Sequence, residues 1–270
     1  MNYTLNCGGR LLSLDTPQVM GILNVTPDSF YATSRVETEE AIARRAHEIV
    51  EQGAAIIDVG ACSTRPGSEP VSAQQESERL RLALGVIRRE MPDAIVSVDT
   101  FRPDIARMAV EELGADIIND VGQSASSVND RRSVSMYRMV ARLGVPYVLM
   151  SRESGMSSML MWLSGEVQAL RDCGQKDIII DPGFGFGKTL EENYSVLRDL
   201  EQLQLLELPV LVGVSRKSMI YKLLGVQPDA ALNGTSVIHV MALERGAKIL
   251  RVHDVREAVE CVRINKMLYV

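Results

Sequence analysis

Short apolar runs alternate with longer amphipathic segments along most of the chain, a pattern typical of strands that are each followed by a helix. The apolar runs predict buried strands at 19–24, 55–60, 95–100, 116–121, 146–151, 177–181, 209–215 and 248–253. The segments between them predict helices at 38–52, 72–91, 103–113, 131–143, 158–173, 190–207, 216–224 with 235–245, and 255–268. Eight such βα units favour an α/β fold of the (β/α)8 type, the TIM barrel, over an open sheet.

The first residues of the chain do not follow this alternation. Between 3 and 14, two short apolar segments flank Gly8-Gly9, a dipeptide typical of two-residue hairpin turns. We therefore expect an N-terminal β-hairpin that plugs one end of the barrel. No linker or low-complexity segment divides the rest of the chain, so the prediction is a single domain over residues 1–270.

Composition narrows the range of functions. The chain has 270 residues, 46% of them hydrophobic, which is enough for one large core. Its net charge of −6 argues against general nucleic-acid binding. No apolar run is long enough to cross a membrane, and the N-terminus lacks the pattern of a secretory signal. The four cysteines are far apart and suit reduced thiols, so we expect a cytoplasmic protein.

One stretch, 177–188, joins a buried strand to an unusual loop. Three isoleucines lead to Asp181, Pro182 ends the strand, and Gly183, Gly185 and Gly187 then alternate with phenylalanines. Glycines permit positive φ angles and let a ligand approach the backbone closely. A carboxylate at the end of a buried strand is costly to desolvate unless it binds something. A tight turn with a solvated aspartate would explain the same pattern, so this stretch alone does not define a site.

Polar side chains also end most of the other predicted strands. A lone aspartate or asparagine in such a position is often a helix cap. Seven of the eight predicted strands end in this way, which is more than chance alone would give. In a barrel these groups converge on the C-terminal face, where barrel enzymes hold their catalytic groups.

The strand-end groups form two chemical sets. Asp99, Asn119 and Asp181 suit a flat heterocycle with amino and ring N–H donors, because a carboxylate accepts two parallel N–H bonds. The second set suits a phosphate-like anion beside a hard metal ion, because an amide oxygen is a ligand that Mg²⁺ accepts. The helix predicted to begin at 216 adds the attraction of its N-terminus for anions. The members of the second set are Asn24, Thr64, Arg65, Ser215, Arg216, Lys217, Arg251 and His253.

A series of motifs carries a family resemblance. In order, they are GILNVTPDSF (21–30), IIDVG (56–60), STRPG (63–67), SVDT (97–100), IND (118–120), DPGFGFGK (181–188), GVSRKS (213–218) and RVHD (251–254). Each is weakly specific, but together they closely resemble the dihydropteroate synthase family. The resemblance implies a (β/α)8 barrel, usually a homodimer, that acts in the folate pathway. Such enzymes join (7,8-dihydropterin-6-yl)methyl diphosphate to 4-aminobenzoate, giving 7,8-dihydropteroate and diphosphate, and sulfonamides compete with 4-aminobenzoate.

The resemblance also implies a role for each matching residue. Asp99, Asn119, Asp181 and Lys217 are implied to hold the pterin, and Asn24 to bind Mg²⁺. The residues implied to hold the diphosphate are Thr64, Arg251 and His253. Those implied to shape the 4-aminobenzoate pocket are Phe30, Thr64, Arg65, Pro66, Phe186 and Ser218. The implied catalytic residues are Asp99, Asp181, Lys217, Arg251 and His253. The implied partners are small-molecule substrates and a second copy of the chain, with no nucleic acid and no membrane.

Two places depart from the family's pattern. Tyr31 and Ala32 follow Phe30 where many relatives have Ser-Asp-Gly-Gly. In the fifth predicted strand, Ser151 stands where relatives commonly have a histidine, and the Met-rich segment 156–162 follows. Both departures leave the two chemical sets intact.

Two other functions compete with this interpretation. A methyltransferase that acts on methyltetrahydrofolate and a corrinoid partner shares the pterin-binding acids, but it has no use for the motifs at 63–66 and 215–218. A non-catalytic pterin-binding paralogue is suggested by Ser151 and the changed loop around it.

Overall fold

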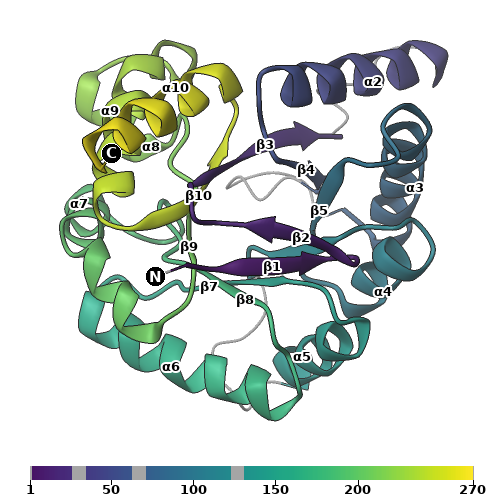
Figure 1. Ribbon diagram of the computed structural model, residues 1–270, viewed down its shortest axis with the longest axis horizontal. Coiled ribbons are helices and arrows are strands. Elements are labelled where there is room, and N and C mark those ends of the chain that lie inside the picture. Colours follow the sequence, from purple (N-terminus) through teal and green to yellow (C-terminus); the bar gives the residue numbers. More distant parts are fainter. Residues whose placement is uncertain (1, 26–34, 63–70, 123–130, 270) are drawn as a thin grey trace.

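The barrel predicted from the sequence is present. The computed structural model describes residues 2–25, 35–62, 71–122 and 131–269. Within them, parallel strands close into a barrel in the order β10-β3-β4-β5-β6-β7-β8-β9 (Figure 1). The strands are β3 (Gln18–Asn24), β4 (Ile56–Gly60), β5 (Ile95–Asp99), β6 (Ile117–Asp120), β7 (Tyr147–Met150), β8 (Ile178–Asp181), β9 (Val210–Val212) and β10 (Ala247–Val252). Each overlaps one predicted strand, so the TIM-barrel prediction is confirmed.

Helices surround the strands (Figure 1). Two of them begin with capping boxes, in which the side chains of Ser72 and Thr189 accept from backbone N–H groups that the first turn leaves unpaired. The helices are α2 (Arg35–Glu51), α3 (Ala73–Glu90), α4 (Pro103–Glu111), α5 (Arg131–Leu143), α6 (Met156–Asp172), α7 (Leu190–Arg198), α8 (Ser218–Leu224), α9 (Leu232–Glu244) and α10 (Val255–Lys266).

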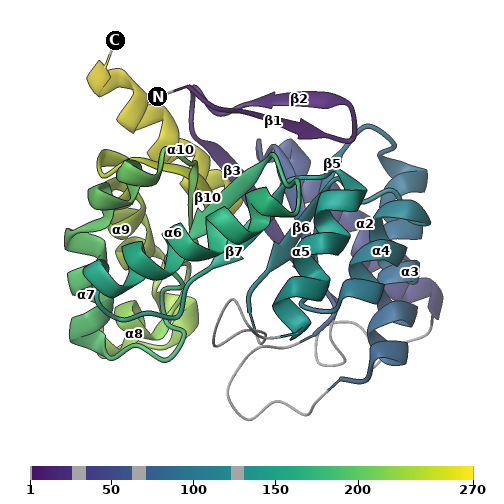
Figure 2. The ribbon, with the colours of Figure 1, turned by 90° about the horizontal axis from the view of Figure 1, so that it is seen from below.

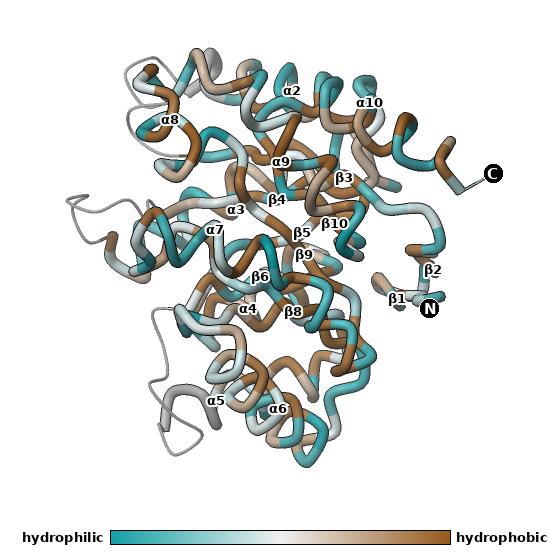
Figure 3. Tube along the Cα trace, turned by 90° about the vertical axis from the view of Figure 1, so that its left-hand side faces the viewer, coloured by the Kyte–Doolittle hydropathy of each residue, from teal (hydrophilic) through white to brown (hydrophobic). Residues whose placement is uncertain are grey.

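Apolar side chains fill two regions. The larger one lies between the strands and the surrounding helices. The smaller one lies inside the barrel near its N-terminal end, where Met20, Ile56, Ile117 and Val148 point inward. The central strands are accordingly coloured mainly brown in Figure 3, whereas the helices alternate between brown and teal. Layered branched side chains of this kind make the interior a packed core and leave only its C-terminal end for chemistry.

The N-terminal hairpin closes the other end of the barrel. It consists of β1 (Thr4–Cys7) and β2 (Arg10–Ser13), joined by Gly8 and Gly9 with φ angles of 60° and 89°. Leu5 and Cys7 pack into the inner apolar cluster. Figures 1 and 2 show the hairpin lying across one end of the strands, so the predicted plug is confirmed.

Two predicted helices differ from the structure. The segment 190–207 is α7 followed by the 3₁₀ helix η1 (Leu200–Leu206). Leu200 and Leu203 are fully buried, and their spacing of three suits the three residues per turn of a 3₁₀ helix. The helix expected to begin at 216 begins at Ser218, because Arg216 has a φ angle of 54°, which an α-helix cannot accommodate.

Candidate active site

The carboxyl ends of all the barrel strands meet at one mouth, on the side away from the hairpin (Figure 2). Asn24, Asp99 and Asp181 are the last residues of β3, β5 and β8. Asn119 and Arg251 each lie one residue before the end of their strands, β6 and β10. Strand geometry alone therefore gathers members of both chemical sets at this mouth.

A buried network joins the two sets directly. Arg251 donates from Nε to Asp58 Oδ2 at 2.6 Å and from Nη2 to Asp99 Oδ2 at 3.0 Å. Asn119 donates from Nδ2 to Asp58 Oδ1 and Oδ2 at 3.3 and 3.2 Å. The guanidinium is thus held between two carboxylates, one of which also holds the amide. The cation expected at the anion site and two acceptors expected at the ring site form a single cluster.

Burial raises the pKa of Asp99 to about 7, against the opposing effect of the Arg251 guanidinium. Asp58 and Asp120 add to the increase through charge repulsion. A carboxyl group at a cleft with a pKa near neutrality is a functional-site candidate, because its charge responds to a bound ligand.

The glycine loop after β8 forms a second part of the mouth. Gly183 donates its backbone N–H to Asp181 Oδ1 at 2.7 Å, and the Lys217 ammonium donates to the carbonyl of Phe184 and lies 4.6 Å from the centre of the Phe186 ring. Burial raises the pKa of Asp181, while the Lys217 charge opposes that increase. Burial also lowers the pKa of Lys217 to about 8, and Asp181 opposes that change in turn. Both groups are therefore poorly solvated, and each favours the charged form of the other.

Asn24 lies beside this network. A Cβ atom at Gly60 would stand 2.9 Å from Asn24 Oδ1 and 3.9 Å from Asp99 Oδ2, so the missing side chain of Gly60 leaves room between the amide and the carboxylate. This is where an amide oxygen and a carboxylate could serve a hard cation together with substrate oxygens.

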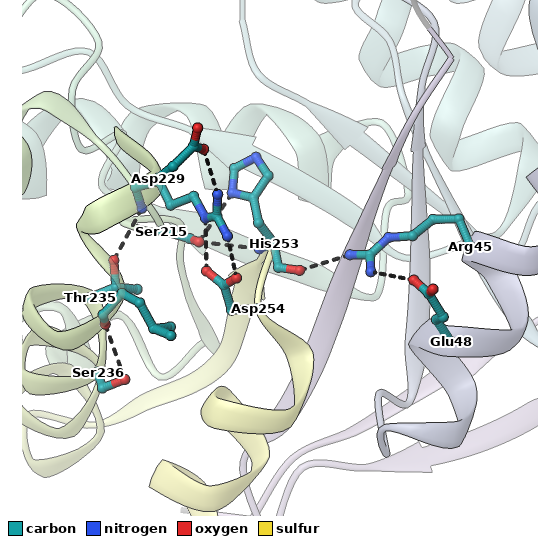
Figure 4. Close-up of polar contacts among 10 residues, drawn as sticks. Arg45, Glu48, Ser215, Asp229, Thr235, Ser236, His253 and Asp254 are labelled. Carbon is teal, nitrogen blue, oxygen red and sulfur yellow. Dashed lines mark hydrogen bonds and ion pairs between the residues drawn. The ribbon is translucent and has the colours of Figure 1, made fainter. Parts of the chain in front are cut away.

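His253 is fixed on the rim by its neighbours. The Ser215 hydroxyl lies 3.1 Å from His253 Nδ1 and also accepts the His253 backbone N–H at 3.1 Å. Arg45 donates to the His253 carbonyl at 2.7 Å and forms an ion pair with Glu48 at 3.2 Å. Figure 4 shows His253 between Ser215 and Arg45. The imidazole orientation is therefore set before any ligand arrives.

Arg216 was grouped with the anion-binding residues from the sequence, and in the structure its side chain pairs with two acids. Its guanidinium forms a bidentate pair with Asp254 at 3.0 and 2.6 Å and donates to Asp229 at 2.8 Å. Both acids are drawn in Figure 4. The left-handed backbone of Arg216 turns its side chain toward these acids, so its charge is neutralised locally. The expected helix N-terminus is also absent at this residue, since α8 begins at Ser218.

The remaining predicted residues divide into two groups. Phe186 and Ser218 are half-buried, the first in the glycine loop and the second at the start of α8. Phe30, Thr64, Arg65 and Pro66 lie outside the described residues.

Ser151 occupies the position that departs from the family's pattern. It is fully buried, its backbone N–H donates to the Asp181 carbonyl at 2.8 Å, and its hydroxyl accepts the N–H of Glu153 at 3.2 Å. Ser151 therefore supports the strand that carries Asp181 and starts the turn that follows β7.

Asp58 lies within the motif at 56–60, and no role was predicted for it from the sequence. It is a buried aspartate inside an otherwise apolar strand, in register with Ile22 on β3 and Ser97 on β5. An acid at an inward position among isoleucines is a signal in the sequence, but its partners come from strands far along the chain. Asp120, by contrast, points away from the mouth and accepts the Tyr147 hydroxyl at 2.7 Å.

Comparison with known proteins places the chain in a family. It matches the family model described as pterin binding enzyme over residues 20–253. The dihydropteroate synthase of Escherichia coli (strain K12) is 38% identical over 95% of this chain and 93% of its own. The chain belongs to the dihydropteroate synthase family. The members of this family are transferases of folate synthesis.

Solved dihydropteroate synthases have the same fold. The enzyme from Xanthomonas albilineans with 4-aminobenzoic acid has a TM-score of 0.88 and 37% identity, covering 100% of this chain and 99% of that one. The enzyme from Coxiella burnetii in complex with pteroic acid has a TM-score of 0.84 and 34% identity over 98% of each chain. Among the residues described here, no helix is both long and apolar enough to span a membrane.

Proposed function

We propose that the chain joins (7,8-dihydropterin-6-yl)methyl diphosphate to 4-aminobenzoate, giving 7,8-dihydropteroate and diphosphate. Its membership of the dihydropteroate synthase family supports this reaction. The observation that carries it in the structure is the Asp99–Arg251–Asp58–Asn119 network, because it places acceptors for a ring beside a cation for a phosphorylated tail.

The ring lies, in this proposal, among Asp99, Asn119, Asp181 and Lys217. Carboxylates accept the ring N–H and amino groups in parallel pairs, and the lysine ammonium donates to the ring carbonyl. The raised pKa of Asp181 and the lowered pKa of Lys217 support this placement. Each charged group lacks full solvation until a polar ligand binds beside it.

The diphosphate lies toward Arg251 and His253. Among the described residues, Arg251 bonds to acids through Nε and Nη2, so Nη1 remains as a donor for a phosphate oxygen. Asn24 fits a magnesium ion, because Mg²⁺ keeps several waters and takes only one or two protein oxygens beside substrate phosphates. When bound, the ion neutralises charge on the departing diphosphate. Thr64, which lies outside the described residues, is proposed to bind the same group.

The reaction follows from these charges. The C–O bond to the diphosphate breaks and its electron pair leaves with the diphosphate oxygen, so positive charge develops on the pterin methylene carbon. The negative charges of Asp99 and Asp181 stabilise that positive charge, while Arg251 and His253 stabilise the leaving group. The nitrogen of 4-aminobenzoate then donates its lone pair to the methylene carbon and loses a proton. A neutral arylamine needs little activation, so the site provides charge and position more than a base.

The 4-aminobenzoate pocket is proposed to involve Phe186 and Ser218, together with residues in the loops outside the described part. Phe186 and Ser218 both adjoin Lys217, one through its ring and one through the chain. Sulfonamide competition is expected at this same pocket.

A homodimer is proposed through the α9–α10 side of the barrel. These two helices pack against each other and carry exposed apolar side chains, including Val237 and Met241 on one face of α9. An exposed apolar patch of this kind is typical of a protein interface. Val237→Glu is expected to give monomers by sedimentation velocity. Met161→Glu, at a more exposed apolar position on α6 (78% against 47% for Val237), is the control and should leave the dimer intact.

A cytoplasmic location is also proposed. All four cysteines lie among the described residues and none is in a disulfide, which suits a reducing compartment.

The decisive test is diphosphate release with both substrates and Mg²⁺ present. We expect release that depends on 4-aminobenzoate and falls when a sulfonamide is added.

Asp181→Ala is expected to abolish pterin binding measured by calorimetry, because it removes the acceptor at the centre of the ring site. A wild-type chain that binds pterin but releases no diphosphate would instead favour the non-catalytic paralogue suggested by Ser151.

A further inference from the structure

Asp58 is a fully buried carboxylate for which the proposed reaction has no direct use. It lies on β4, two residues before the strand's end at Gly60, and its side chain is 0% exposed. Burying a charge is strongly unfavourable unless hydrogen bonds and opposite charges compensate for the lost hydration. The identity of its partners therefore indicates why an acid stands at this position.

The partners of Asp58 are both residues assigned to substrate. Oδ2 accepts from Arg251 Nε at 2.6 Å, and both oxygens accept from Asn119 Nδ2, at 3.3 and 3.2 Å. Asp99 holds Arg251 from another direction, through Nη2 at 3.0 Å. Two carboxylates fix the plane of the guanidinium, whereas Asp99 alone would let it pivot.

The contact with Asn119 has a chemical consequence. A carboxylate only accepts hydrogen bonds, so the side of the amide that faces Asp58 must be the NH₂ group. The amide oxygen then lies on the other branch of the side chain, as an acceptor. A ring with amino and N–H groups requires an acceptor there, and an amide turned the other way would present a second donor.

We propose that Asp58 is a positioning residue that fixes the amide orientation of Asn119 and the guanidinium of Arg251. It thereby makes the site selective for the amino side of the pterin without contacting the pterin itself. This inference rests on the proposed function, because it assumes that Asn119 and Arg251 face the substrate.

The first test is Asp58→Asn, which keeps the shape and removes the obligatory acceptor. The probe is 6-hydroxymethylpterin, which has the ring but no diphosphate, so its affinity reports on the ring contacts alone. We expect calorimetry to give about 10- to 100-fold weaker binding, the range expected when a buried hydrogen-bonding group is left mismatched. In steady-state kinetics, KM for the pterin diphosphate should rise while KM for 4-aminobenzoate stays unchanged.

The second test exchanges the acid and the amide. In the double variant Asp58→Asn with Asn119→Asp, the new amide at 58 donates to the new carboxylate at 119, which presents an acceptor to the ring in either orientation. We expect the double variant to recover at least about tenfold of the lost affinity. A residue with a merely structural role would not give this recovery, because the second substitution adds another buried change.

Two control variants separate positioning from stability. Asp116→Asn removes another buried carboxylate, 4% exposed, which pairs with Arg10 and Arg88 at 2.7 and 2.8 Å at the hairpin end of the barrel. It should lower stability as Asp58→Asn does but leave the affinity for 6-hydroxymethylpterin unchanged. Ser97→Ala changes a side chain beside Asp58 whose hydroxyl has no hydrogen-bond partner within the described part of the chain, and it should change neither property.

Two results would overturn the proposal: equal affinity in wild type and Asp58→Asn, or a double variant that binds no better than the single one. If Asp58→Asn does not fold, the double variant is compared with Asn119→Asp, which brings two carboxylates together and should bind more weakly than the double variant. Failure of the proposed function is a separate result, because it appears as wild-type protein that releases no diphosphate while the ring affinities still test Asp58.

Discussion

Asp99 and Lys217 are half-buried ionisable side chains whose pKa values move toward neutrality from opposite directions. Burial raises that of Asp99 to about 7 and lowers that of Lys217 to about 8. The proposed reaction needs Asp99 ionised, so activity is lost as pH falls through about 7. It needs Lys217 charged, so activity is lost as pH rises through about 8. We therefore predict a narrow bell-shaped profile of kcat/KM for the pterin diphosphate, with its maximum between these values.

The measurement is a pH series at saturating 4-aminobenzoate and fixed Mg²⁺. Asp99→Asn should lower the rate and flatten the acid limb, because the variant has no carboxyl group to protonate there. An acid limb that persists unchanged in Asp99→Asn would assign the titration to another group.

At the residue scale, the sequence predicted where the site residues lie better than it predicted which residues they bind. Asp99, Asn119, Asp181 and Arg251 could be placed at one mouth because parallel strands end together. The roles of Arg216 and Asp58 could not be found in this way. Arg216 turns to Asp229 and Asp254 because of one left-handed backbone residue, and a non-glycine residue gives no local signal of that conformation. Asp58 depends on contacts with two distant strands, which no local pattern encodes.

At the element scale, the glycine loop between β8 and α7 determines how closely the site packs. A Cβ atom at Gly183 would lie 2.1 Å from the Ser151 carbonyl oxygen, and the φ angle there is 66°. Gly187 has a similar φ angle of 70°, but a Cβ atom would meet nothing within 4 Å. The two glycines thus share the backbone requirement and differ in the space around them.

We predict that Gly187→Ala costs about 1–2 kcal/mol of unfolding free energy, from the left-handed backbone alone. Gly183→Ala should cost about 1–3 kcal/mol more, because the new Cβ meets the backbone carbonyl of Ser151, which cannot move aside easily. It should also raise KM for the pterin diphosphate, since the Gly183 N–H that binds Asp181 must shift. Urea denaturation and steady-state kinetics measure both effects. Equal losses in the two variants would mean that contact with Ser151 does not restrict the loop.

The segment 190–207 shows where element prediction reached its limit. Its apolar pattern correctly predicted a helix at 190, but the change to 3₁₀ at Leu200 follows from packing of Leu200 and Leu203 against the core. A spacing of three between leucines fits the apolar face of an α-helix equally well, so the pattern alone could not separate the two forms.

At the scale of the whole molecule, the two ends of the barrel have different tasks. The hairpin end is closed by apolar packing and by the ion pairs of Asp116 with Arg10 and Arg88. The other end carries the charged network around Arg251. An inner layer that includes Met20, Ile56 and Val148 separates them. A packed interior of this kind should let stability at one end change without altering the chemistry at the other.

The hairpin offers a matched test of that separation. Leu5 is 2% exposed and packs inside the barrel end, whereas Leu11 on the other strand is 77% exposed. Leu5→Ala should lower the free energy of unfolding by about 2–5 kcal/mol, the usual cost of a cavity in a packed core. Leu11→Ala should change it by less than about 0.5 kcal/mol. Both variants should keep the wild-type kcat and KM values at 25 °C, where the folded state still predominates. A large loss of kcat in Leu5→Ala, with unfolding unchanged, would show that the hairpin end is coupled to the active site, contrary to this division of tasks.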